Sequence, residues 1–186
     1  MKSMNQWLVA PSWGVGGSAA VVGGTVGKYL AKGPNDEFNL YFGGIGPSIS
    51  IGVRKITDKL GSRSGAGSIP QFPALGSPLY FSRYHYAKMN DAYTEGRAAR
   101  IMTTGPGMIV EGGALFGAGA NLQLLVFGYN QSINPAAVIT VILECLTYTY
   151  VGDFQSSFMA GFGIVGGTGL GAGASVGVTA YFGAWV

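Results

Sequence analysis

Apolar residues and glycines alternate with a period of two near the end of the chain. From residue 170 to residue 186 the even positions carry Leu, Ala, Val and Phe, whereas the odd positions carry Gly, Ser, Thr, Tyr and Trp. Successive side chains of a strand point to opposite faces of its sheet, so this pattern predicts one apolar face and one glycine-rich face. Gly163, Gly167 and Gly171 also have the spacing of a close-packed membrane helix. All glycines from 161 to 183 except Gly166 occupy odd positions, which favours a strand, and each glycine would cost a helix about 1 kcal/mol relative to alanine.

The same mixture of glycine with β-branched and aromatic residues recurs upstream in residues 13–29, 38–53, 107–129 and 136–151. Several of these stretches exceed an average strand, so we expect bends or hairpin turns at double glycines such as Gly112-Gly113 and Gly166-Gly167. Closure would remove the sheet edges that a chain with few charges cannot protect. We therefore predict an all-β fold: a single-domain antiparallel β-barrel over residues 1–186, with about eight to ten glycine-rich strands.

The composition explains why the outer face of this barrel matters. Among 186 residues, 33 are glycine and only 10% are charged, against roughly 25% charged residues in an ordinary globular domain. Either the exterior is neutral and rich in Ser, Thr, Asn and Tyr, or part of the outer face meets lipid, a protein partner, a second copy of the chain or an apolar ligand. The net charge of +3 comes without a run of Lys and Arg, so no nucleic-acid partner is predicted.

Targeting and cofactor signals are absent from the sequence. Residues 1–7 lack a cationic stretch followed by an apolar run, so no classical signal peptide is predicted, no transmembrane helix is favoured, and the compartment stays open between soluble and membrane-associated. The single cysteine, Cys145, and the single histidine, His85, cannot form an internal disulfide or a zinc site. We predict neither a metal nor a cofactor.

One polar region interrupts the glycine-rich pattern. Residues 56–78 are rich in Gly, Ser and Pro and predict a long exposed loop. The next stretch alternates polar and aromatic residues and then predicts a short helix near residues 94–102, capped by Thr94, with Arg97 and Arg100 on one side. Two arginines so placed could hold a phosphate or a carboxylate, or pair with acids of the chain itself. The candidate ligand-binding residues are Arg83, Tyr84, His85, Tyr86, Arg97 and Arg100.

Two isolated acidic residues are the candidates for buried carboxylates. Glu144 is the only charged residue between Gly112 and Gly152, and Glu111 begins an apolar strand. A buried carboxylate needs a partner, so an ion pair to Arg83, Arg97 or Arg100 is expected. The alternative is that a carboxylate acts with His85 as acid and base.

Three functional classes remain, and no catalytic residue is predicted, because the Gly-x-Ser-x-Gly motif of residues 173–177 lies within an alternating strand. The preferred interpretation is a non-enzymatic β-barrel that binds an apolar ligand, a membrane surface or a protein partner. The first alternative is a membrane-inserting or pore-forming barrel, although the chain ends in Val186 rather than in an aromatic residue. The second is an enzyme with a site around His85.

Overall fold

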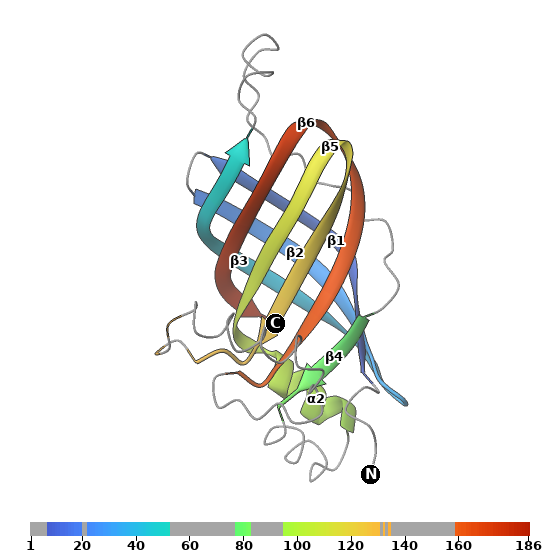
Figure 1. Cartoon of the computed structure of the whole chain (residues 1–186). Helices are drawn as coiled ribbons and strands as arrows, with labels where there is room; N and C mark the ends of the chain where they lie inside the picture. The colour runs from blue at the N-terminus through green and yellow to red at the C-terminus, as the bar shows by residue number, and fades with distance from the viewer. Residues whose placement is uncertain are drawn as a thin grey trace.

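A computed structural model describes residues 7–19, 22–52, 77–82, 95–130, 132, 134 and 159–186. These residues form a closed antiparallel β-barrel of eight strands and one short helix (Figure 1). The predicted all-β barrel and its approximate strand number are confirmed. Nearly all of the predicted loop at residues 56–78 lies outside the described residues.

Six strand segments and helix α2 build the barrel. The segments are β1 (Leu8–Ala19), β2 (Val22–Lys32), β3 (Glu37–Gly52), β4 (Ser77–Phe81), β5 (Gly105–Phe127) and β6 (Gly161–Trp185), and α2 spans Glu95–Thr103. Their order in the sheet is β3-β2-β1-β4-β6-β5, and an additional pairing of β3 with β6 contributes to closure of the barrel. The helix lies where the sequence predicts one.

The two long segments each supply two strands of the barrel. Figure 1 shows β5 and β6 rising from the end of the barrel that carries α2, bending at the opposite end and descending again. Their pairing shifts register between Phe116 and Ala118. The descending part of β5 returns beside its start, where the backbone N–H of Tyr129 donates to the carbonyl of Pro106 at 3.0 Å. We call the two ends of the barrel the α2 end and the far end.

The expectation that strands turn at the double glycines is wrong for both of the pairs named above. Register continues unbroken through Gly112-Gly113 and Gly166-Gly167. In the barrel, glycines instead make room for large inner side chains. A Cβ at Gly44, for example, would lie 2.7 Å from the ring of Phe42.

Aromatic rings fill the barrel interior at the α2 end. The Trp185 ring lies with its centroid 4.8 Å from that of Phe42, 4.5 Å from that of Phe127 and 5.3 Å from that of Tyr29. The indole N–H of Trp185 donates to the carbonyl of Val126 at 2.9 Å. Helix α2 contacts β3, β5 and β6 and buries Ala98 and Ala99 against the same core. This end of the lumen is therefore packed with side chains.

Backbone segments approach closely where β3 meets β6. A Cβ at Gly183 would overlap the carbonyl oxygen of Gly43, and a Cβ at Gly46 would overlap that of Ala180. Any side chain at these two positions would push the paired strands apart.

We therefore expect Gly183→Ala to destabilise the barrel by about 1–3 kcal/mol, the usual cost of forcing atoms into a packed site. The matched control is Gly43→Ala, because a Cβ there meets nothing within 4 Å. Thermal unfolding followed by circular dichroism compares the two variants. Equal midpoints would contradict the close approach of β3 and β6.

Candidate functional site

A polar network crosses the barrel interior next to the aromatic core. The hydroxyl of Tyr29 donates to Oε1 of Gln123 at 3.0 Å, and Nε2 of Gln123 donates to Oε1 of Glu111 at 3.3 Å. The hydroxyl of Tyr181 is hydrogen-bonded to Glu111 and to Thr179. The network links β2, β5 and β6, and Gln123 is buried within it. Because buried polar groups are costly unless they are paired, these contacts favour one arrangement of the strands around the lumen.

The sequence-based candidates have different outcomes. Glu111 is half-buried and lies beside the neutral side chains of Gln123 and Tyr181. A buried carboxylate paired with an arginine stays a prediction for this residue. Arg97 and Arg100 lie on the exposed face of α2. The remaining candidates lie outside the described residues: Arg83, Tyr84, His85, Tyr86 and Glu144. The role of all these residues in ligand binding stays a prediction.

The outer wall is apolar towards the far end. Strand alternation places Tyr29, Gln123 and Tyr181 inside, so their sequence neighbours point outward. Large apolar side chains are exposed on this wall: Trp13, Val22, Val26, Tyr41, Ile45 and Leu122. The inside of the barrel therefore holds a polar network beside its aromatic core, while large apolar side chains are exposed outside, and exposed apolar patches mark contact surfaces.

The described part of the chain contains eight charged residues. Glu111 is inside the barrel, and the others are Lys28, Lys32, Asp36, Glu37, Glu95, Arg97 and Arg100. Lys32, Asp36 and Glu37 lie at the end of β2 and the turn into β3, and Glu95, Arg97 and Arg100 belong to α2. Lys28 is therefore the charged residue of the described outer wall nearest the far end. Beyond Lys28, the described outer wall of β1, β2, β3, β5 and β6 carries no charge up to the far end.

Lys28 belongs to a row of outward residues on neighbouring strands. Trp13 pairs with Lys28, and Lys28 pairs with Tyr41. Tyr41 and Val186 exchange two backbone hydrogen bonds of 2.8 and 2.9 Å. The Lys28 ammonium lies 5.8 Å from the centroid of the Tyr41 ring. We call these four residues the Lys28 row.

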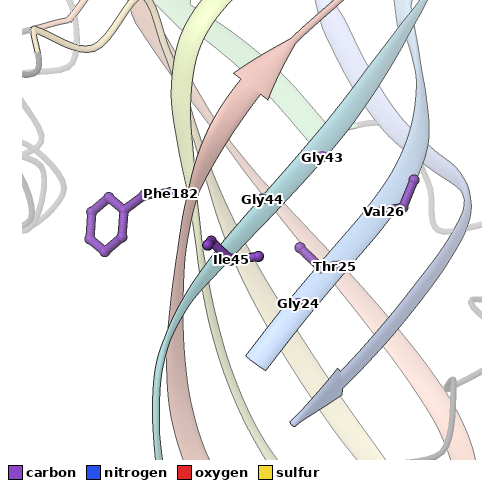
Figure 2. Close-up of a pocket in the computed structure, with 7 residues that line it drawn as sticks. All are labelled: Gly24, Thr25, Val26, Gly43, Gly44, Ile45 and Phe182. Carbon is purple, nitrogen blue, oxygen red and sulfur yellow. The ribbon is translucent and has the colours of Figure 1, made fainter. Parts of the chain in front are cut away.

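A groove of about 500 Å³ lies on the outer wall beside this row. Figure 2 shows the stretch of β3 around Gly43 and Gly44 without side chains, between Val26 on β2 and Phe182 on β6. The groove is lined by Gly24, Thr25, Val26, Gly43, Gly44, Ile45 and Phe182. Val26 pairs with Gly43, the next outward pair after Lys28 and Tyr41. The groove therefore begins where the Lys28 row ends.

Neither the network nor the groove has a direct signal in the sequence. Tyr29 and Gln123 are 94 residues apart, and neutral polar residues in a glycine-rich strand do not stand out. Lys28 is a single lysine next to apolar residues. Only the register between strands shows that it lies beside Trp13 and Tyr41.

Helices and metal-binding groups offer no alternative site in the described part of the chain. No helix there is long and apolar enough to cross a membrane. No group of three His, Cys, Asp or Glu residues lies together there in a metal-binding arrangement. The sequence matches no family model, no curated protein and no solved structure. The function is therefore inferred from geometry and chemistry alone.

We expect Tyr29→Phe to lower the free energy of unfolding by about 1–3 kcal/mol, because the buried Oε1 of Gln123 loses its donor. Tyr41→Phe is the matched control, since Tyr41 is exposed on the outer wall. Urea titration measures both variants. A Tyr29→Phe variant as stable as Tyr41→Phe would show that the network contributes little to the fold.

Proposed function

We propose that this protein is a membrane-spanning β-barrel whose outer wall contacts lipid acyl chains. The observation that carries the proposal is the uncharged outer band between the Lys28 row and the far end, with Ile45 71% exposed within it. Transmembrane barrels alternate apolar residues towards lipid with polar residues towards the lumen. The polar network inside and the apolar band outside follow this rule.

Strand length supports the same proposal. A tilted strand needs about 9–11 residues to cross a bilayer. β1 has 12 residues, β2 has 11 and β3 has 16. Over its whole length each of these segments reaches the number needed to cross once, and the bent segments β5 and β6, at 23 and 25 residues, reach it twice. Between the Lys28 row and the far end, β1 and β2 contribute Trp13–Ala19 and Val22–Lys28.

The filled lumen favours a closed barrel over an open pore. Eight strands enclose a space that side chains can fill completely. At the α2 end that space holds Trp185, Phe42 and Phe127, with α2 packed against the same core. We therefore propose a role that depends on the barrel wall, such as anchoring or binding within the membrane, rather than diffusion of solutes through the lumen.

Tryptophan fluorescence tests the proposed membrane contact. The chain has three tryptophans, of which Trp13 is 46% exposed on the outer wall while Trp7 and Trp185 are 2% and 0% exposed. In vesicles of phosphatidylcholine with brominated acyl chains, we expect quenching of Trp13 emission only. The quenched component should disappear in the Trp13→Phe variant. Unquenched emission of the wild type, or a monodisperse protein without detergent, would overturn the proposal.

A charge placed on the outer wall gives a second, independent test. We expect Ile45→Arg to cost about 2–4 kcal/mol if Ile45 faces lipid near the bilayer centre. In water, a substitution at so exposed a position would cost within about 0.5 kcal/mol. Asn39→Arg is the matched control, because Asn39 is an exposed residue of the same strand nearer the α2 end. Urea titration of protein refolded in vesicles separates the outcomes, and equal stability of both variants would contradict lipid contact at Ile45.

A further inference from the structure

Among the residues that the structure describes, the cation nearest the groove on the outer wall is Lys28. Its lining consists of glycine, three apolar side chains and Thr25. Following the ladder of β2 and β3 towards the α2 end, the next outward pair after Val26 and Gly43 is Lys28 and Tyr41. A molecule that fills the groove and extends towards the α2 end therefore meets the ammonium group of Lys28.

We propose that the groove and Lys28 together bind one anionic phospholipid, with an acyl chain over Gly43 and the phosphate at the Lys28 ammonium. This inference rests on the proposed membrane-spanning function. The groove volume of about 500 Å³ falls within the range of ligand pockets, about 300–1,000 Å³. A flexible acyl chain can follow the bare backbone at Gly43, where an added Cβ meets nothing within 4 Å.

The Lys28 row has the composition of a membrane interface. Trp and Tyr concentrate where acyl chains give way to headgroups, and lysine directs its ammonium from an apolar surface towards that layer. Trp13 and Tyr41 flank Lys28 on the two neighbouring strands. The row therefore places the ammonium at headgroup depth while the groove lies at acyl-chain depth.

Charge selects the anionic headgroup. Lys32 pairs with Glu37 across the β2–β3 ladder, so an acidic residue faces this lysine. Lys28 faces the neutral side chains of Trp13 and Tyr41 instead. An ammonium in this setting attracts a phosphate that no choline group neutralises, and one basic residue near an anionic surface is worth about 1 kcal/mol, or about fivefold in binding.

Trp13 reports on the occupant because it pairs directly with Lys28. The full-length protein is placed in phosphatidylcholine vesicles that contain either brominated phosphatidylglycerol or brominated phosphatidylcholine at the same mole fraction. The emission of Trp13 is obtained by subtracting that of Trp13→Phe. We expect the relative binding constant from quenching to favour phosphatidylglycerol by about fivefold.

Charge and groove variants separate a site from general attraction to anionic lipid. We expect Lys28→Gln to abolish the preference and Lys32→Gln to keep it. Gly43→Val fills the groove without a steric clash at its Cβ and is expected to remove most of the preference although Lys28 is retained. Its control is Gly166→Val, a substitution at an exposed position of β6 opposite Leu122.

The failures of the two proposals are distinguishable. No quenching by either brominated lipid would overturn the membrane-spanning function itself. Equal quenching by both lipids in the wild type would overturn only the lipid site. A full preference that survives in Gly43→Val would also overturn the site, because it would then arise from surface charge without the groove.

Discussion

An eight-stranded barrel has a narrow axis, and the indole of Trp185 occupies it at the α2 end. Trp185 packs against Phe42 and Phe127 and donates to the carbonyl of Val126 at 2.9 Å. Its neighbour on the closing strand pair is Phe42, so the same residue fills the lumen and lies where β3 meets β6. Glycine makes this possible, because a Cβ at Gly107 would overlap the indole ring. The inner glycines are thus a requirement of lumen packing.

Packing inside the barrel also determines the surface outside. Side chains alternate along each strand, so a register slip by one residue would exchange the two faces. The Tyr29–Gln123 hydrogen bond joins β2 and β5, which are not neighbours in the sheet, across the lumen and favours the arrangement in which both side chains point inward. With these residues inside, Val26 and Leu122 must point outward, where both are exposed. The polar network and the apolar outer band are therefore two consequences of one register.

The sequence predicted the fold better than the site, for a physical reason. Alternation is local, so a period of two indicates a sheet without any knowledge of which strands pair. Glu111 stood out because it is an isolated charge, and it is hydrogen-bonded to Gln123. Gln123 gave no such signal, and its partner Tyr29 is 94 residues away. Hairpin turns were wrongly expected at Gly112-Gly113 and Gly166-Gly167, because composition does not distinguish a glycine that turns the chain from one that accommodates a ring such as Phe42.

The protein covers its outward apolar residues selectively. At the α2 end, Met108, Val126 and Phe162 point outward and are buried under neighbours that include Tyr129 and Met159. Four residues along the same strand from Val126, which is 0% exposed, Leu122 points outward and is 57% exposed. Removing an apolar side chain from water is favourable, so the neighbours that cover Val126 stabilise the barrel, whereas Leu122 has no such cover. Outward apolar residues that are buried by their neighbours at the α2 end, followed by an exposed and uncharged band, fit a barrel whose α2 end lies in water and whose band lies in lipid.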